Sequence, residues 1–263
     1  MKAMILAAGR GERMRPLTDR LPKPLLPAGG KPLIVWHLER LARAGIRDIV
    51  VNHAWLGERL EAELGDGSAW GVRIAWSPER EALETAGGIA QALPLLAAGL
   101  PPMRAAVEPF LVVNGDTWSD FDYGRARTIA LQMRHAGLAS WCVMVSNPPH
   151  HPAGDFGLLD GRLRLVPGDA ATPHAAADDG DRRRHGATPA RLTYAGIGLY
   201  TPAVFDAIPA GSRSPLRPWL EREIAAGRAG GEYHAGLWFD IGTPQRLAEL
   251  DRLIANGPAH VED

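Results

Sequence analysis

Cysteine is almost absent from this chain, and so are the long apolar segments of membrane proteins. Cys142 is the only cysteine among 263 residues, so a disulfide within the chain is excluded and a reducing compartment is expected. Because it lies in an apolar run at 141–145, we interpret Cys142 as a buried structural thiol. No run approaches the roughly 20 apolar residues of a membrane span, and residues 1–9 lack the cleavage region of a signal peptide. These features predict a soluble, cytoplasmic protein without a membrane partner.

A large net charge is also missing. Lys and Arg number 29 and Asp and Glu number 30, which gives a formal net charge of −1. The broad basic surface of nucleic-acid-binding proteins is therefore not expected, and nucleic acid is excluded as a main partner. A small anionic ligand needs only a local cluster of positive charge, and Arg10, Arg13 and Arg15 form one. The chain length fits one large domain or two small ones.

Short apolar runs of strand length recur along the first half of the chain. Most are apolar at consecutive positions, which is typical of strands covered on both faces. The expected strands are 3–8, 48–52, 73–76, 110–114 and 140–146, and the helical patterns between them are 32–45, 58–64, 88–98 and 124–136. This alternation predicts an α/β fold with a doubly wound, mixed and mostly parallel sheet of the Rossmann-like type. Ligands of such sheets bind at the carboxyl ends of the strands.

The pattern loosens after Asn147. Short strands are expected at 162–166 and 191–200, and helices at 216–226 and 244–255. Residues 168–190 contain almost no large apolar side chain, so they predict a mobile insert. We therefore expect a single domain, residues 1–263, built from two halves at 1–147 and 148–263.

Two common phosphate-binding motifs are incomplete or missing. The first strand runs into Gly9-Arg10-Gly11, but Met14 stands where the dinucleotide fingerprint needs a third glycine. The Walker-type GxxxxGK[ST] motif does not occur, so dinucleotide oxidoreductases and Walker-type kinases are disfavoured. What is present is a glycine turn that brings backbone N–H groups close to a ligand, followed by Arg13 and by Lys23 in a Pro-Lys-Pro step. Polyphosphate is the ligand that this arrangement suits best.

Two aspartates in apolar surroundings are the candidate metal ligands. Asp116 follows the strand at 110–114 through Gly115, which puts it at the carboxyl edge of the predicted sheet. Asp240 lies between an aromatic and an aliphatic residue, and on its own this pattern fits a turn or helix-capping aspartate equally well. Mg²⁺ binds few protein carboxylates and fills its other positions with phosphate oxygens and water. One acid from each half of the chain would satisfy that preference.

The opening segment resembles the signature of the sugar-1-phosphate nucleotidyltransferases. The resemblance rests on LAAGRGERMRPLT at 6–18 and PKPL at 22–25, and later landmarks follow in order over nearly the whole chain: VNHAWLG at 51–57, LETAGGI at 83–89, VNGD at 113–116 and WFDIGT at 238–243. These segments are closest to the bacterial N-acetylmuramate-1-phosphate uridylyltransferases of cell-wall recycling. The resemblance implies that UTP and a sugar 1-phosphate react with Mg²⁺ as cofactor to give a UDP-sugar and pyrophosphate. It also implies a nucleotide-binding half at 1–147 and a sugar-phosphate-binding half at 148–263.

The resemblance further implies a role for individual residues. Arg13 would hold the triphosphate and the leaving pyrophosphate, and Lys23 would neutralise charge at the α-phosphate and the incoming phosphate. Asp116 and Asp240 would bind Mg²⁺. Nucleotide contacts are implied for Ala7, Ala8, Gly9, Gly11, Asn52, His53, Gly87 and Gly88, and sugar-phosphate contacts for Glu84, Gly154, Asp155 and Gly196. From the residues alone, His53 fits a loop hydrogen bond and Glu84 fits an exposed surface position as readily.

The chain departs from the family at two positions. Ala86 stands where the close subgroup usually has Gly, and the Glu-Lys pair that many relatives carry after the segment at 154–157 is missing before Tyr194. The phosphate of the acceptor sugar therefore has no identified partner. A muramate carboxylate would need a basic group as well, and Arg217 or the run at 182–184 could supply it.

Several alternatives stay open at the level of the sequence. Glucose 1-phosphate and mannose 1-phosphate are alternative acceptors, and UTP is not distinguished from dTTP or GTP. A regulatory module that binds a sugar nucleotide without catalysis is the alternative from another class. The oligomeric state is not determined, and a monomer is compatible with the sequence.

Overall fold

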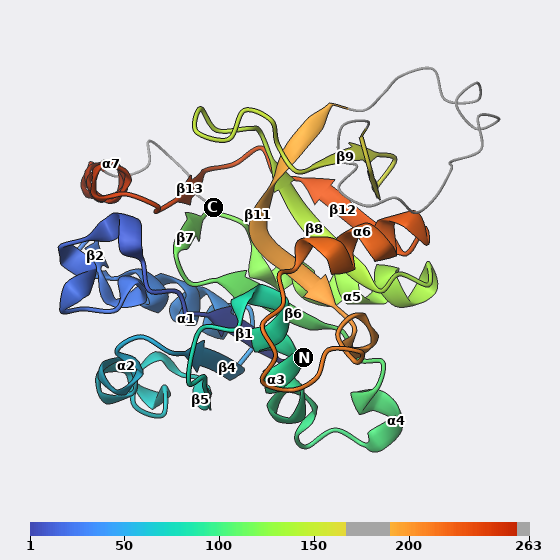
Figure 1. Cartoon of the computed structure of the whole chain (residues 1–263), viewed down its shortest axis with the longest axis horizontal. Helices are drawn as coiled ribbons and strands as arrows, with labels where there is room; N and C mark the ends of the chain where they lie inside the picture. Colours follow the sequence, from blue (N-terminus) through green and yellow to red (C-terminus); the bar gives the residue numbers. More distant parts are fainter. Residues whose placement is uncertain (167–189, 257–263) are drawn as a thin grey trace.

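A mixed sheet runs through the computed structural model, which describes residues 1–166 and 190–256 (Figure 1). In this part of the chain the sheet has nine strands in the order β5-β4-β1-β6-β11-β8-β12-β10-β9. Neighbours among β5, β4, β1 and β6 are parallel, as are β8 and β12, whereas β11 runs antiparallel between β6 and β8. The predicted doubly wound, mixed and mostly parallel sheet is thereby confirmed. The insert expected at 168–190 lies outside the described residues except for its last position.

The elements have the following bounds. The strands of the large sheet are β1 Ala3–Leu6, β4 Asp48–His53, β5 Arg73–Pro78, β6 Phe110–Asn114, β8 Ser140–Val145, β9 Phe156–Leu159, β10 Arg162–Arg164, β11 Arg191–Tyr200 and β12 Ala229–Tyr233. Two small antiparallel pairs are β2 Pro27–Ala28 with β3 Lys31–Pro32, and β7 Thr117–Ser119 with β13 Trp238–Asp240. The helices are α1 Leu33–Arg43, α2 Gly57–Leu64, α3 Glu84–Ala97, α4 Pro102–Ala105, α5 Ala126–His135, α6 Arg217–Ala225 and α7 Pro244–Ala255.

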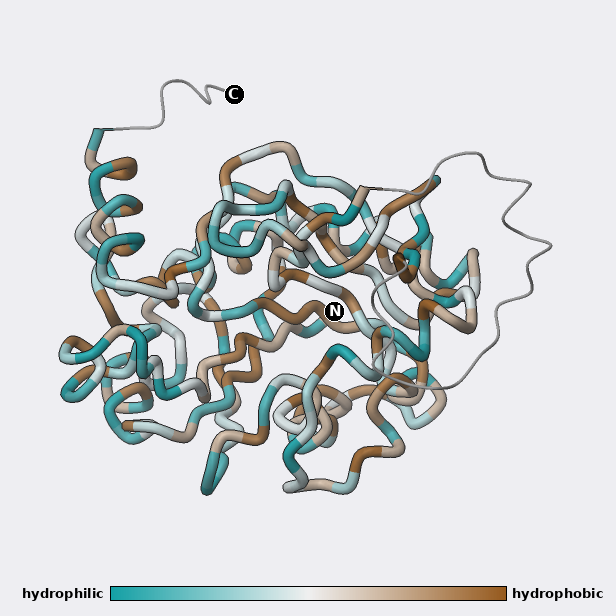
Figure 2. Tube along the Cα trace, turned by 45° about the horizontal axis from the view of Figure 1, so that its top comes forward, coloured by the Kyte–Doolittle hydropathy of each residue, from teal (hydrophilic) through white to brown (hydrophobic). Residues whose placement is uncertain are grey.

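Helices cover both faces of the sheet. Buried side chains of α1, α2 and α5 form one hydrophobic cluster with Ile5 of β1, and those of α3 and α6 form another with Met4. Successive residues of a strand point to opposite faces, so a strand covered on both sides is apolar at consecutive positions. Figure 2 shows the hydrophobic residues gathered in the interior segments of the chain.

Cys142 belongs to the second of these clusters and is fully buried. Burial raises the pKa of its thiol to about 12, so the predicted structural role is confirmed. None of the helices in residues 1–166 and 190–256 has the length and apolar character that crossing a bilayer requires.

Helix α7 forms a third cluster at the edge of the sheet. Its Leu247 and Leu250 pack with Met14, which follows β1, and with Trp118 of β7. The segment that carries Asp240 is therefore fixed against the glycine loop, although the two are far apart in the sequence.

Helix α3 begins at Glu84, four residues before the start expected at residue 88, so Gly87 as well as Gly88 lies within the helix. The Leu83 N–H group donates to Glu79 Oε2 at 2.8 Å, which fixes the chain at the helix start. A side chain at Gly88 would lie 2.6 Å from Glu79 Oε1, and one at Gly87 would meet the backbone at 212–214. Both glycines are needed because other segments pack against this first turn.

Candidate active site

The carboxyl ends of β1, β4 and β6 open on a pocket of about 490 Å³. Leu6 at the end of β1 is in register with Asn52 of β4 and with Asn114 of β6. From β1 the chain builds outward through β4 and β5 and then returns to β6 on the other side of β1. This reversal of strand order is where doubly wound sheets bind their ligands. The predicted site residues that line the pocket are Ala7, Ala8, Gly9, Gly11, Arg13, Lys23, Asn52, Glu84 and Asp116.

The loop after β1 turns at Gly11 and closes over Lys23. Gly11 has a φ of +66°, and a side chain there would lie 3.0 Å from Thr18 Cγ2 and 3.2 Å from Lys23 Cβ. Glycine adopts this left-handed conformation without strain. The Thr18 hydroxyl donates to the Gly11 carbonyl at 2.8 Å and holds the turn. At Gly9, by contrast, a side chain would meet nothing within 4 Å, so this backbone is open to a ligand.

The three loop arginines have different surroundings. Arg10 lies over the Trp55 ring at 4.5 Å, and Arg15 pairs with Asp19 at 2.6 Å. Arg13 lines the pocket, and within residues 1–166 and 190–256 it has no ion pair. Of these three arginines, Arg13 is therefore the one whose positive charge faces the pocket.

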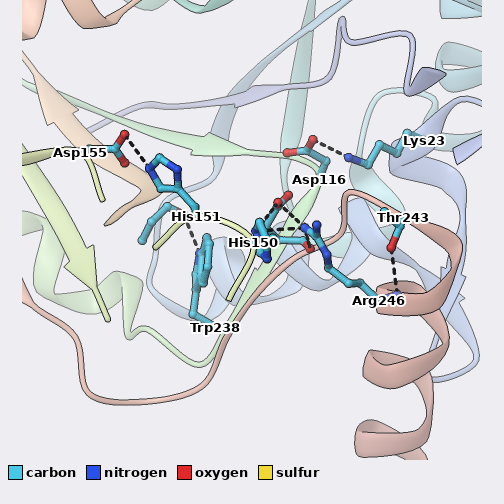
Figure 3. Close-up of polar contacts among 10 residues, drawn as sticks. Lys23, Asp116, His150, His151, Asp155, Trp238, Thr243 and Arg246 are labelled. Carbon is cyan, nitrogen blue, oxygen red and sulfur yellow. Dashed lines mark hydrogen bonds and ion pairs between the residues drawn. The ribbon is translucent and has the colours of Figure 1, made fainter. Parts of the chain in front are cut away.

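The small β7–β13 pair brings the two predicted metal ligands together. Asp240 is in register with Thr117, and the Ile241 N–H group donates to the Asp116 carbonyl at 3.1 Å. Asp116 Oδ2 lies 2.7 Å from Lys23 Nζ, and Asp240 Oδ2 lies 2.7 Å from Arg246 Nη1 (Figure 3). Each carboxylate thus has a positive partner. Asp240 ends β13, and Asp116 lies in the turn just before β7, the strand that pairs with β13.

The two carboxylates, Asp116 and Asp240, suit a hard divalent cation that takes most of its ligands from substrate and water. Across the described residues no group of three or more His, Cys, Asp or Glu side chains could hold a metal. A cation bound by Asp116 and Asp240 would complete its shell with phosphate and water. That is the coordination Mg²⁺ prefers beside a nucleotide.

A buried histidine supports this corner of the site. His37 Nε2 donates to the Thr117 carbonyl at 2.8 Å, and its Nδ1 accepts from the Tyr123 hydroxyl at 2.9 Å. A carbonyl can only accept, so the proton is on Nε2. Burial lowers the pKa of His37 to about 4, so the ring is neutral near pH 7. It anchors β7 beside Asp116.

The opposite wall of the pocket depends on Asn52. Its Oδ1 accepts from the Ala7 N–H group at 2.9 Å, and its Nδ2 donates to Glu79 Oε1 at 2.6 Å. Burial raises the pKa of Glu79. The Ala7 N–H group is therefore already paired, which leaves the N–H groups of Ala8 and Gly9 for a ligand.

Comparison with known proteins agrees with this geometry. A family model described as nucleotidyl transferase matches residues 2–162. The chain belongs to the nucleotidyl transferase family. It is 51% identical to the N-acetylmuramate alpha-1-phosphate uridylyltransferase of Neisseria meningitidis serogroup B, over 96% of this chain and 98% of that protein. It is 35% identical to the protein of the same name from Caulobacter vibrioides, over 95% of this chain and 96% of that one.

A solved structure shares the fold. A Bacillus anthracis protein assigned as a glucose-1-phosphate thymidylyltransferase superposes with a TM-score of 0.73 and covers 100% of this chain and 98% of its own. At 18% identity, this likeness carries the fold alone.

Several residues predicted for the nucleotidyltransferase site do not line the pocket. His53 Nε2 lies 2.6 Å from Glu61 Oε1, and both residues line a separate cavity beside α2. Gly87 and Gly88 are buried within the first turn of α3, where they make room for neighbouring segments. Their direct contact with a nucleotide stays a prediction.

Three of the predicted sugar-phosphate residues, Gly154, Asp155 and Gly196, lie on or beside β11, whereas Glu84 begins α3. Asp155 Oδ2 accepts from the Tyr194 N–H group at 2.8 Å, and the Gly154 turn, with a φ of +62°, precedes it. Gly196 has a φ of +74°, and a side chain there would lie 2.7 Å from Asn114 Nδ2. Gly196 therefore allows Asn114 to stand at the pocket wall.

Two arginines near the nucleotidyltransferase site were not predicted. Arg213 lines the pocket and its Nε lies 2.7 Å from Glu84 Oε1, with Glu84 in the left-handed region at a φ of 60°. Arg246 pairs with Asp240. Arg213 comes from a loop rich in Gly, Ser and Pro, where no local pattern marks it. Arg246 lies three residues after Thr243, the cap of α7, and that spacing alone suggests only a helix start.

Proposed function

We propose that this nucleotidyltransferase joins UTP to N-acetylmuramate 1-phosphate, which gives UDP-N-acetylmuramate and pyrophosphate. The observation that carries the proposal is the 51% identity to the Neisseria meningitidis uridylyltransferase over nearly the full length of both chains. We further propose that the reaction belongs to peptidoglycan recycling in the cytoplasm, because its product is a peptidoglycan building block and its donor is UTP. No nucleic acid or membrane partner is needed for it.

The proposed reaction places few covalent demands on the protein. An oxygen of the sugar phosphate attacks the α-phosphorus of UTP, the bond to pyrophosphate breaks, and pyrophosphate leaves. A general base is unnecessary, because the attacking oxygen is already ionised near neutral pH. Positioning and charge neutralisation dominate such reactions. This fits a pocket whose lining includes the glycine loop and the positive side chains of Arg13, Lys23 and Arg213.

Lys23 and Arg13 are the proposed cationic groups of the reaction. Lys23 is held inside the pocket by Asp116, so it would meet the α-phosphate and the incoming phosphate without a large movement. Arg13 lines the same pocket and would hold the triphosphate and the leaving pyrophosphate. We propose Asp116 and Asp240 as the ligands of Mg²⁺. When bound, the ion would neutralise phosphate charge during the transfer.

A substrate panel tests the proposal. N-acetylmuramate 1-phosphate, glucose 1-phosphate and mannose 1-phosphate would each be offered with UTP, dTTP or GTP, and pyrophosphate release would be measured with Mg²⁺ and with EDTA. The highest kcat/KM is expected for N-acetylmuramate 1-phosphate with UTP, and EDTA should abolish turnover. A preference for mannose 1-phosphate and GTP would contradict the proposed substrates. Nucleotide binding without release from any pair would favour a non-catalytic module.

A further inference from the structure

Arg246 of α7 lies beside the Asp240 carboxylate and close to Gly242, which lines the pocket. Its Nη1 donates to Asp240 Oδ2 at 2.7 Å and to the Asp240 carbonyl at 3.2 Å, and His150 Nε2 lies 3.1 Å from Nη1 and 3.3 Å from Asp240 Oδ2. The side chain of Arg246 is only 19% exposed. Figure 3 shows Arg246 and His150 side by side, below Lys23 and Asp116. The guanidinium is therefore fixed close to the proposed metal ligand.

Arg246 and Arg13 approach the same backbone position from different elements. At Gly242, which lines the pocket, a side chain would lie 3.0 Å from Arg246 Nη1 and 3.3 Å from Arg13 Nη2. Two positive groups this close repel each other unless an anion lies between them. Within the described ranges Asp240 is the carboxylate paired with either of them. Around Gly242, two guanidinium groups thus lie beside one paired carboxylate, which favours an anionic ligand between them.

Arg13 and Arg246 come from different parts of the chain, so we expect them to bind different anionic groups. Arg13 belongs to the loop after β1, at the nucleotide side of the pocket. Arg246 and His150 come from the second half of the chain, as do three of the four predicted sugar-phosphate residues, Gly154, Asp155 and Gly196. A divalent ion at Asp240 would compete with Arg246 for the negative charge of that carboxylate, so the guanidinium would interact more strongly with a second anion once the ion is bound.

We propose that Arg246 binds the phosphate of the acceptor sugar 1-phosphate, in exchange for its ion pair with Asp240. The proposal rests on the proposed function. A guanidinium offers two parallel N–H donors to a phosphate, which a lysine cannot do. Arg246 would thereby supply the acceptor-phosphate partner that the sequence left unidentified, and it would hold the attacking oxygen beside Lys23.

Binding measurements test the assignment independently of turnover. Wild type, Arg246→Ala, Arg246→Lys and the control Arg252→Ala would be saturated with Mg²⁺ and a UTP analogue whose α–β bond cannot break. Acceptor affinity would then be measured by calorimetry. Arg246→Ala should raise the acceptor Kd roughly 10- to 100-fold, the loss expected for a charged hydrogen bond, and Arg246→Lys should lose less. Arg252 is exposed on the same helix, and within the described part of the chain its side chain donates to a carbonyl of that helix, so its variant should match wild type.

Two further measurements separate the competing roles of Arg246. The loss should persist with the lactyl methyl ester of N-acetylmuramate 1-phosphate, and a loss that disappears with the ester would assign Arg246 to the carboxylate and overturn the proposal. Binding of Mn²⁺ alone should be unchanged or tighter in Arg246→Ala, because a competitor for Asp240 is gone. Weaker Mn²⁺ binding with normal acceptor affinity would make Arg246 a mere support for Asp240. An increase in Arg246→Ala that is confined to the KM for UTP would also overturn the proposal that Arg246 binds the acceptor phosphate.

Failure of this inference can be told from failure of the proposed function. The wild-type panel decides which acceptor is used, and Arg246 is then tested with that acceptor. If another sugar 1-phosphate is preferred, the proposed substrate is wrong while the test of Arg246 still applies. Thermal unfolding of each variant shows whether the fold is retained.

Discussion

Lys23 and Asp116 form an ion pair at the pocket wall, with Lys23 Nζ 2.7 Å from Asp116 Oδ2. The lysine side chain is only 8% exposed, whereas the aspartate side chain is 40% exposed. Pro22 and Pro24 flank the lysine and restrict the backbone on both sides of it. The positive charge is therefore in position before any substrate arrives. Preorganised charge of this kind stabilises a transition state without reorganisation during the reaction.

Replacement of Lys23 should affect the chemical step more than the binding of UTP. We expect Lys23→Ala to lower kcat by about 10²-fold or more, equivalent to about 2.7 kcal/mol of transition-state stabilisation, with a smaller change in the KM for UTP. Lys31→Ala is the matched control, since Lys31 pairs with Glu39 outside the pocket, and it should retain normal kcat. Steady-state pyrophosphate release measures both constants. A raised KM with normal kcat would limit Lys23 to ground-state binding.

Removal of one proposed metal carboxylate should lower turnover with little effect on folding. Asp116→Asn keeps an oxygen that can accept from Lys23, so its thermal midpoint should remain close to that of wild type. We expect turnover with Mg²⁺ to fall by about 10²-fold or more and Mn²⁺ affinity to fall with it. Asp48→Asn is the control, because Asp48 pairs with Arg73 at the amino end of β4, away from the site. Normal turnover and metal affinity in Asp116→Asn would remove the metal role.

The bounds of several elements could be predicted from local sequence alone. The strand at 110–114, the strand at 191–200 and the helix at 244–255 have the predicted bounds. Consecutive apolar residues define the first of these. In the helix, Thr243 is the cap and Pro244 is the first helical residue, a position that proline favours. Each signal lies within the element that it defines.

Other elements depend on partners far away in the sequence. Strands β7 and β13 have three residues each, which is too short for a recognisable strand pattern in the sequence. They are stabilised by pairing with one another. Strand β12 contains Gly230 and Gly231, which are poor strand formers, but side chains there would collide with Trp141 and Leu163. The tertiary neighbours, not the local propensity, determine these strands.

The candidate site divides in the same way. The glycine loop, Lys23 and Asp116 follow strands that the sequence defines, so their convergence at one sheet edge could be predicted. The positions of Arg246 and Arg213 at the site could not be predicted, because their ion pairs with Asp240 and Glu84 form only in the folded chain. A single arginine in a helix or loop has no local pattern that reveals what it faces.

Two glycines of the pocket should respond differently to alanine. A methyl group at Gly9 meets no atom within 4 Å, so Gly9→Ala should leave the free energy of unfolding unchanged and raise the KM for UTP if phosphate approaches this backbone. A methyl group at Gly88 would lie 2.6 Å from Glu79 Oε1 and 2.8 Å from Asn52 Nδ2. Gly88→Ala should therefore lose roughly 1–3 kcal/mol of stability, the usual cost of overpacking. Urea unfolding and UTP kinetics on both variants check the contrast, and a stable Gly88→Ala protein would argue against the tight contact.

The neutral His37 beneath β7 should make stability depend on pH. Burial lowers its folded-state pKa to about 4, whereas an unfolded histidine titrates near pH 6.5. Between these values the unfolded chain binds a proton that the folded chain does not, so the free energy of unfolding falls as the pH falls, by about 3 kcal/mol over the full interval. His37→Gln should flatten this slope in urea unfolding between about pH 7.5 and pH 4.5, because glutamine can still donate to the Thr117 carbonyl but does not titrate.

Two comparisons isolate the contribution of His37. His135 is exposed on α5, so His135→Gln should keep the wild-type slope. Burial raises the pKa of Glu79, so its folded form takes up a proton more readily and its contribution to stability increases as the pH falls, opposite in sign to that of His37. Glu79 is present in all three proteins, and its effect cancels when the slopes are subtracted. If His37→Gln and wild type lost stability in parallel down to pH 4.5, the histidine would be protonated in the folded state, and its proposed role as a neutral anchor of β7 would be wrong.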